Sequence, residues 1–318
     1  TTETLRRPVI ECAARAGKAV YVEKPVAGTL AETLAIRDIV TQSGIPFCVG
    51  HNRRCSPAMA DARRIWRDHM ARPVDCPWRF DRVGRRKASM PYADTGSMLV
   101  RINDDFATWK EWVFDDALSE RGPMVFEMTH FTDLCNWFLG AEPEAVMAME
   151  SGWMHEGVVI RYRTGEMATV TMTGAGTFGY PKELYELYGK AGAVIVDHML
   201  EVRTAGIAAA SPRATYPMLN DRHPDVGAEG GVPGWLAKKR EACREAEEKD
   251  DPRLIFTAEP DKGHARMMDA FAEEIRGLRP EPVCPIGDAV RATVLAFAAR
   301  RAAKERRMVN VGELDGTG

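Results

Sequence analysis

The stretch GKAVYVEKP, residues 17–25, decides the fold class. Its glycine ends a helical pattern that begins near residue 3, and the apolar run 19–22 that follows is typical of a buried parallel strand. A second helical pattern covers 30–42, and a second apolar run covers 45–50. Helix and strand alternating in this order predict parallel crossover units and an α/β fold.

The pattern changes after residue 73. Short alternating runs separated by glycine-rich turns indicate a large open sheet that is mixed or antiparallel. A helix is expected over 57–70 and another over 121–139, where Leu139-Gly140 ends it. The expected strands cover 74–82, 97–103, 144–152, 157–163, 167–173, 183–188 and 193–197, with a basic loop between the first two.

The last third of the chain is predicted to leave the sheet and then return to the first domain. Residues 205–260 are rich in Pro, Gly, Asp and Arg and form an excursion, in which the charged helix 235–249 is expected to face solvent. Two helices, 263–277 and 286–306, close the chain. We therefore divide it into residues 1–52 and 53–318, with helix 286–306 packing back on the first part.

Composition excludes several classes of protein. Lys and Arg number 43 against 46 Asp and Glu, a net charge of −3, which argues against nucleic acid as a partner. No apolar run approaches the roughly 18 residues of a membrane span. The seven cysteines form no C-x-x-C pair, which argues against a disulfide framework or a metal site. A cytoplasmic protein with reduced thiols is the expectation.

One glycine cluster matches a dinucleotide fingerprint on paper. Residues 174–179, GAGTFG, fit G-x-G-x-x-G after a strand-like run, and Asp197 lies about 20 residues further on. The fingerprint requires a helix next, because the helix N-terminus holds the pyrophosphate. A hairpin pattern follows instead, over 183–188 and 193–197. We reject the fingerprint and expect a turn between strands.

Polar residues follow both apolar runs of the first domain. Glu23, Lys24 and Pro25 end the first, and His51, Asn52, Arg53 and Arg54 end the second. Carboxyl ends of parallel strands share one edge, which is where ligands bind in open α/β sheets. Adjacent arginines suit a polyhydroxy or anionic ligand. The alternative is a solvated charged turn.

Helix 121–139 carries the most informative polar residues. Glu127, His130 and Asp133 recur at i, i+3 and i+6 among strongly apolar neighbours, so they share one broad face. A buried carboxylate or imidazole needs a partner or a cleft, and histidine suits acid–base work near neutral pH. The alternative is a core histidine held by Asp133.

Together these segments resemble the Gfo/Idh/MocA oxidoreductases. The resemblance rests on residues 16–25, 49–57, 122–133 and the closing helices, in order over nearly the whole chain. It implies the C-terminal part of a Rossmann domain, then an α+β domain whose open sheet binds a sugar-like substrate and builds a homo-oligomer. It also implies NAD or NADP as cofactor and a sugar or cyclitol hydroxyl, or its ketone, as substrate.

The resemblance gives the candidate residues their roles. It implies that Lys24 is the lysine beside the nicotinamide ribose and the substrate hydroxyl, and that His130 transfers the proton. Glu127 stands three residues before His130, where many members carry Asp four before. The expected sites are catalytic Lys24, Glu127 and His130; cofactor-binding Glu23, Lys24, Pro25 and Asn52; and substrate-binding Arg53, Arg54 and Asp133.

The chain departs from the family at its beginning. It has no glycine fingerprint before the first helix, which suggests a fragment that lacks roughly 80 residues, by the usual size of two to three βα units. We expect such a chain to bind NAD(P) poorly and to be inactive alone. Two other functions stay open: NAD-dependent glycoside cleavage of the kind a minority of the family performs, and non-catalytic sugar binding or assembly.

Overall fold

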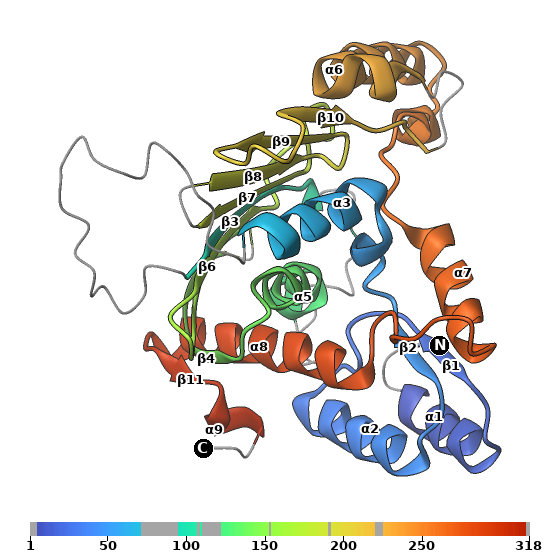
Figure 1. Ribbon diagram of the computed structural model, residues 1–318, viewed down its shortest axis with the longest axis vertical. Coiled ribbons are helices and arrows are strands. Elements are labelled where there is room, and N and C mark those ends of the chain that lie inside the picture. Colours follow the sequence, from blue (N-terminus) through green and yellow to red (C-terminus); the bar gives the residue numbers. More distant parts are fainter. Residues whose placement is uncertain are drawn as a thin grey trace.

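The computed structural model describes residues 5–70, 95–106, 109, 122–152, 154–189, 192–219 and 225–315 (Figure 1). The predicted strand 74–82 and nearly all of the basic loop after it lie outside these residues. Buried apolar side chains from both ends of the chain, from Ile10 to Val311, form one contiguous core.

The first part of the chain folds as the sequence predicts. Strand β1 (Val20–Val22) and strand β2 (Phe47–Val49) pair in parallel, and helices α1 (Arg6–Arg15) and α2 (Leu30–Ser43) accompany them. The Thr29 hydroxyl accepts a hydrogen bond from the backbone N–H of Glu32 at 3.2 Å, which caps α2. Gly44 ends α2 in the left-handed conformation at φ 64°.

The second sheet has nine strands in the order β10-β9-β8-β7-β3-β6-β5-β4-β11. β3 pairs in parallel with β6 and antiparallel with β7, and the other neighbours are antiparallel, which confirms the large mixed sheet. Strands β9, β10 and β11 are short and were not predicted from the sequence pattern. The strands are β3 (Ser97–Asn103), β4 (Pro143–Ser151), β5 (His155–Tyr162), β6 (Met167–Thr173), β7 (Glu183–Gly189), β8 (Gly192–Asp197), β9 (Glu201–Ala205), β10 (Arg213–Thr215) and β11 (Val309–Asn310).

Three helices cover one face of this sheet (Figure 1): α3 (Pro57–Ile65), α5 (Met128–Leu139) and α8 (Ile286–Glu305). α3 follows the short 3-10 helix η2 (Asn52–Cys55) and continues as a π-helical turn, Trp66–Met70. α8 contacts α5 and β4 and also α2 and β2, so it joins the two sheets. α7 (His264–Ile275) contacts η2 on the other side.

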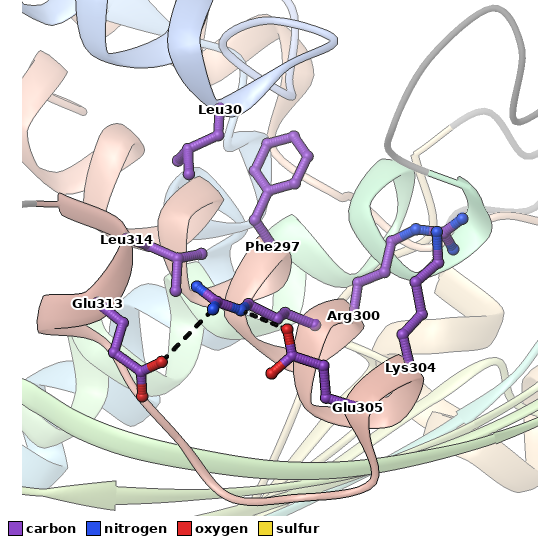
Figure 2. A pocket seen from close by; sticks show the side chains of 8 residues that line it. Leu30, Phe297, Arg300, Lys304, Glu305, Glu313 and Leu314 are labelled. Carbon is purple, nitrogen blue, oxygen red and sulfur yellow. Dashed lines mark hydrogen bonds and ion pairs between the residues drawn. The ribbon is translucent and has the colours of Figure 1, made fainter.

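The carboxyl end of α8 is held against the short helix α9 (Gly312–Asp315) by ion pairs (Figure 2). Arg301 lies 2.8 Å from Glu305 and 3.7 Å from Glu313. Neither α8 nor any other helix of the described residues is long and apolar enough to cross a membrane.

The predicted single helix over 121–139 is wrong in one respect. The structure has two helices, α4 (Gly122–Phe126) and α5, with a break at Glu127. Glu127 has φ −101° and ψ −35°, and its side chain leaves the helix to meet two lysines described below. Ion pairs to distant segments are invisible to helical periodicity, so the pattern alone predicted continuity.

The predicted solvent-facing helix 235–249 is also wrong in part. Helix α6 covers Asp225–Glu248 and is kinked at Gly231, where φ is 55°. Trp235 and Lys239 are each only 1% exposed. The helix therefore buries one face against η7 (Pro252–Thr257) and the end of the large sheet.

Candidate functional site

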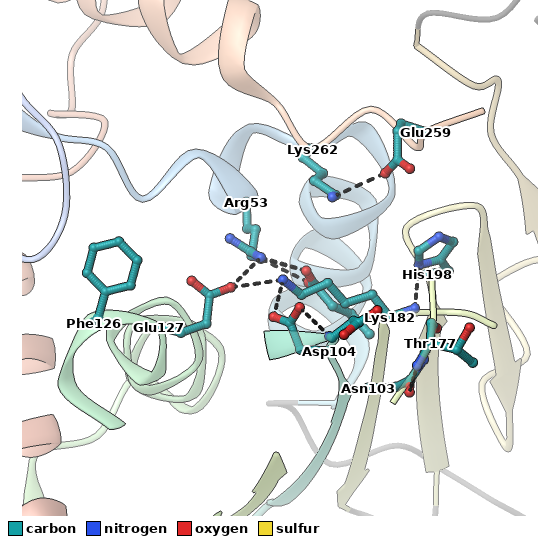
Figure 3. Close-up of polar contacts among 12 residues, drawn as sticks. Arg53, Asn103, Asp104, Phe126, Glu127, Thr177, Lys182, His198, Glu259 and Lys262 are labelled. Atoms are coloured by element: carbon teal, nitrogen blue, oxygen red, sulfur yellow. Dashed lines mark hydrogen bonds and ion pairs between the residues drawn. The ribbon is translucent and has the colours of Figure 1, made fainter. Parts of the chain in front are cut away.

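Three distant segments meet at the carboxylate of Glu127. Lys24, just beyond β1, places its Nζ 2.8 Å from Glu127 Oε2 and donates to the Phe126 carbonyl at 2.8 Å. Lys182, just before β7, places its Nζ 3.1 Å from Glu127 Oε1. Figure 3 shows Glu127 reaching from α5 toward Lys182 and Arg53. The break at Glu127 makes this bridge between the sheets possible.

Further charges complete the cluster around Lys182 and Arg53. Lys182 Nζ also lies 2.7 Å from Asp104 Oδ2, at the end of β3. Arg53 Nη2 lies 2.6 Å from Glu183 Oε1 and 3.6 Å from Glu127 Oε1. We call these six residues (Lys24, Arg53, Asp104, Glu127, Lys182 and Glu183) the Glu127 cluster. Three cations face three carboxylates, which compensates the cost of their burial.

The cluster shifts the pKa of each of its lysines differently. Burial would raise the pKa of Glu127, but Lys182, Lys24 and Arg53 hold it well below its usual range. Burial lowers the pKa of Lys24, and Glu127 offsets this only in part. Burial alone would also lower the pKa of Lys182, but the charges of Glu127 and Asp104 outweigh burial and raise that pKa. Lys24 is therefore the cation that gives up a proton more readily.

His130 stands beside this cluster on α5. The residue is 6% exposed, and its ring meets that of His51 edge to face, with centroids 5.9 Å apart. Its Nδ1 has no hydrogen-bond partner among the described residues. Burial, followed by the charges of Arg53 and Lys24, lowers the pKa of His130 well below its ordinary value. The imidazole is therefore neutral at pH 7 and able to accept a proton.

Arg54 and Asp133, which the sequence predicts to bind substrate, bind each other. Arg54 donates to both oxygens of Asp133, at 2.6 and 2.8 Å, and to Asp288 at 2.9 Å. Asp133 is 1% exposed. Arg54 thereby connects η2 to α5 through Asp133 and to α8 through Asp288. Arg54 and Asp133 do not line a cavity together in this structure.

His51 and Cys284 lie against the same carboxylate. Their ligand atoms and that of Asp133 are all within 4.8 Å of one another, and no other trio of this kind occurs in the described part of the chain. Both Asp133 oxygens already accept from Arg54, and a guanidinium there disfavours a second cation. The trio therefore does not have the free donors of a metal site.

The predicted cofactor residues lie at the carboxyl edge of β1 and β2. Glu23 is exposed, and Pro25 is buried under Arg6, which donates to the carbonyls of both. Asn52 is almost fully buried and donates to the Lys262 carbonyl at 2.7 Å, which ties η2 to the start of α7. A Cβ on Gly50 would lie 2.8 Å from Glu23 Oε2, so this edge tolerates only glycine there without adjustment.

These residues lack the glycine-rich turn that holds a dinucleotide pyrophosphate. Within the described residues, no glycine cluster lies between a strand and a helix beside them. The rejected motif 174–179 is followed by the hairpin of β7 and β8, as expected. A Cβ on Gly176 would lie 1.9 Å from Asn103 Oδ1, so this turn is glycine-rich because it packs against β3.

A cavity of about 220 Å³ adjoins Lys182. Sequence reasoning missed it, because its walls come from segments that have no shared pattern. Two local signals existed: Lys182 stands directly before a strand, and Trp235 and Lys239 are spaced i, i+4 in a charged helix. The lining residues are the polar Asp104, Lys182, His198, Lys239, Glu259 and Lys262 and the aromatic Trp109, Phe178, Tyr180, Trp235 and Phe256.

No family model matches the sequence, but individual proteins do. The chain is 22% identical over 316 residues to the inositol 2-dehydrogenase of Rhizobium meliloti strain 1021, a match that covers 95% of this chain and 76% of that protein. The levoglucosan dehydrogenase of Pseudarthrobacter phenanthrenivorans is 28% identical over 156 residues, which are 49% of this chain and 35% of that one.

A solved structure shows the same fold. Levoglucosan dehydrogenase in complex with NADH and L-sorbose matches with a TM-score of 0.65 and 18% identity, over 98% of this chain and 78% of that chain. The chain is thus similar over nearly its whole length to dehydrogenases of the kind that the resemblance to the Gfo/Idh/MocA oxidoreductases implies. The predicted resemblance and the predicted fold class are confirmed. The roles of individual residues stay predictions.

Proposed function

We propose that the chain provides the substrate-binding and proton-transfer part of a nicotinamide-dependent oxidoreductase that acts on a hydroxyl of a sugar or cyclitol, or on the corresponding ketone. The observation that carries this proposal is the Glu127 cluster beside a neutral His130. Lys24 and Lys182 flank one carboxylate at the edge of β1, where a substrate oxygen and the nicotinamide end of a cofactor would both fit.

In oxidation, His130 accepts the proton of the substrate hydroxyl. Its lowered pKa keeps the imidazole free of a proton before the reaction, and the ammonium of Lys24 donates to the substrate oxygen and orients it. A bound NAD or NADP would supply the nicotinamide that takes up the hydride of the carbinol carbon. Ketone reduction is the same step in reverse, with a protonated His130. Glu127 keeps Lys24 charged and in place.

The cofactor residues keep the assignment that the resemblance implies. Glu23, Lys24 and Pro25 would hold the nicotinamide ribose, and Asn52 would shape the same edge through its hydrogen bond to Lys262. The two homologues and the NADH complex support a nicotinamide cofactor. The choice between NAD and NADP belongs to residues that contact the adenosine ribose.

The cavity beside Lys182 would hold the part of the substrate that does not react. Exposed or half-buried aromatic rings at its rim, those of Tyr180, Phe178 and Phe256, suit the C–H face of a sugar ring, and Asp104 and Glu259 suit its hydroxyls. Small-molecule sites usually combine such apolar walls with a few placed polar groups.

The reaction is tested by joining the N-terminal βαβ units of the Rhizobium meliloti inositol 2-dehydrogenase ahead of Thr1. NAD⁺ and NADP⁺ are then offered with inositol, levoglucosan and L-sorbose, and reduced nicotinamide is measured by absorbance. Reduction with at least one polyol is expected. Release of free sugar from glycosides without net reduction would indicate the hydrolytic alternative, and dinucleotide binding without either reaction would contradict the proposal.

The 318-residue chain by itself is expected to bind NAD⁺ and NADP⁺ poorly. Dinucleotide affinity depends on backbone N–H groups and the helix dipole at a glycine-rich βα turn, and the sequence has no such turn. Calorimetric titration of the chain beside the joined protein checks this. Micromolar binding by the chain alone would show that the cofactor site lies elsewhere.

We also propose that the open face of the large sheet joins copies of the chain. Leu99, Met147, Met149, Val159 and Met167 are exposed on its strands, and no helix of the described residues covers that face (Figure 1). Contiguous exposed apolar surface of this kind marks association sites.

A further inference from the structure

A second cavity, of about 590 Å³, lies between α3, the end of α5 and the loop before α8. This volume falls within the range of about 300–1,000 Å³ that small-molecule sites occupy. Five arginines line it: Arg54, Arg63, Arg64, Arg67 and Arg279. Only two carboxylates, Glu281 and Asp288, do so. We call it the arginine cavity; it shares no lining residue with the cavity beside Lys182.

Two of these arginines have no carboxylate partner in the part of the chain that the structure describes. Arg54 forms an ion pair with Asp288 at 2.9 Å. Arg64 pairs with Asp61 and Arg67 with Asp68, each at 3.2 Å. For Arg63 the described part of the chain provides only the face of Trp137, 5.6 Å from the guanidinium carbon. Among the described residues, Arg279 donates only to the Glu281 carbonyl, at 3.0 Å.

The charge of Arg63 is not balanced by a carboxylate of the described residues, and this affects its pKa. Arg63 is half-buried, and burial followed by the charges of Arg67 and Arg54 lowers its pKa from its ordinary value. Arg63 and Arg67 are one helical turn apart, a spacing at which like charges repel. An anion between α3 and the loop would relieve this repulsion.

The pocket of Figure 2 shows how the same chain compensates such a cluster elsewhere. There Arg301 pairs with Glu305 at 2.8 Å and with Glu313 at 3.7 Å. Arg307, just outside that pocket, pairs with the same two carboxylates at 2.6 and 2.7 Å. Basic side chains at the end of α8 thus receive carboxylates from the protein itself. In the arginine cavity, by contrast, Arg63 and Arg279 pair with no carboxylate of the described residues.

We propose that the arginine cavity binds the phosphate group of a small phosphorylated molecule, through Arg63, Arg67 and Arg279. Guanidinium groups offer a planar pair of N–H donors that matches phosphate oxygens. Trp137, Pro282 and Pro285 give the cavity an apolar wall for the organic part. The site is independent of the proposed oxidoreductase activity, because it needs neither the Glu127 cluster nor a cofactor.

Calorimetric titration of the full chain with inorganic phosphate and with glucose 6-phosphate, at low ionic strength, tests the proposal. Saturable binding of at least one probe is expected, and Arg63→Ala and Arg279→Ala should each weaken it about tenfold or more. Glu281→Gln should tighten it, because a negative charge leaves the rim. Tighter binding of glucose 6-phosphate identifies a phosphorylated metabolite, and equal binding identifies phosphate alone.

Two further variants separate the site from general effects. Arg7→Ala removes an exposed arginine that pairs with Glu11 on α1, and it should leave phosphate binding unchanged. Arg63→Lys should retain part of the affinity, which guards against a loss of folding in the alanine variant. The proposal is overturned if neither probe saturates, or if Arg7→Ala weakens binding as much as Arg279→Ala does.

Discussion

Arg53 and Arg54 are neighbours in η2, yet they lead to two clusters of different character. Arg53 enters the Glu127 cluster, which continues through Lys182 to the wall of a cavity. Arg54 enters a closed cluster with Asp133 and Asp288, beside His51. Both arginines are buried and doubly paired. What distinguishes them is how the charges are matched. Every guanidinium nitrogen of Arg54 donates to an oxygen of Asp133 or Asp288, whereas the cluster of Arg53 contains two lysines that share the Glu127 carboxylate.

The comparison separates two uses of buried charge. In the closed cluster each donor is matched by an acceptor from another helix, which fixes η2, α5 and α8 relative to one another. In the Glu127 cluster two lysines share one carboxylate and keep donors to spare. We therefore expect changes in the closed cluster to alter stability, and changes in the Glu127 cluster to alter ligand binding and reaction rate as well.

Asp133→Ala should have the largest effect on stability. It leaves Arg54 buried without its bidentate partner, which costs about 3–5 kcal/mol in the free energy of unfolding. Urea denaturation measures this, with Glu11→Ala in the exposed Arg7–Glu11 pair as a control that should cost about 0.5 kcal/mol or less. Equal effects of the two substitutions would show that the closed cluster does not brace the helices.

His51 should make stability depend on pH. Burial, only partly opposed by Asp133, lowers the pKa of His51 to about 4. Above pH 6.5 the ring is neutral both folded and unfolded. Between pH 6.5 and about 4, His51 binds a proton in the unfolded chain but not in the folded chain. The free energy of unfolding therefore falls as pH falls. At about 1.4 kcal/mol per pKa unit, the loss reaches at most about 3 kcal/mol.

His51→Asn should flatten this pH dependence, measured as the free energy of unfolding at pH 7 and pH 4.5. The groups that face His51 are Asp133, Arg54, Lys24, Arg53 and His130. His130 has a lowered pKa of its own and leaves part of the slope in the variant. An unchanged slope would contradict the assignment of a neutral buried His51.

Glu127→Gln should cost less stability than Asp133→Ala, about 1–3 kcal/mol. The amide keeps the shape of the side chain, and Asp104 and Glu183 still neutralise Lys182 and Arg53. Removing the charge that raises the pKa of Lys24 should lower that pKa further. Lys24 would then lose its proton at a lower pH, which NMR of the labelled lysine detects. An unshifted titration of Lys24 would contradict the proposed coupling between Glu127 and Lys24.

Met147→Lys should affect folding least, within about 0.5 kcal/mol, because the residue is exposed on the open face of the large sheet. It should nevertheless weaken self-association, since a charge would enter an apolar contact. Analytical ultracentrifugation of the variant beside Arg7→Ala, an exposed change on α1, checks this. A wild-type chain that is monomeric at all concentrations would contradict the proposed role of this face.

Sequence patterns predicted what is local in this molecule. The caps Thr29 and Gly44 and the spacing of apolar residues fixed the first part of the chain, and alternation fixed most strands of the large sheet. The break at Glu127 was not predictable, because the two lysines that its side chain meets lie far away in the sequence, just beyond β1 and just before β7. The same holds for Arg53 and Arg54. Two adjacent arginines predicted a polyhydroxy or anionic ligand, but only their neighbours in the folded chain show that each arginine belongs to a different cluster of ion pairs.

The polar residues of the cavity beside Lys182 show the same limit. Trp235 and Lys239 lie in a helix of high charge, and their burial depends on η7 and on the end of the sheet. A charged stretch usually faces solvent, so composition favoured the wrong interpretation. A long-range contact of this kind leaves no mark within the short windows in which periodicity is measured.

The central claim is that His130 transfers a proton beside Lys24, and the pH profile of a His130→Ala variant tests it most directly. In the joined protein, His130→Ala should lower kcat about 10²–10⁴-fold and leave dinucleotide affinity unchanged. Wild-type kcat for oxidation should stay flat through pH 6.5 and fall only at lower pH, because the pKa of His130 lies well below its ordinary value. An equal loss of affinity and rate, or a profile that the substitution leaves unchanged, would contradict the claim.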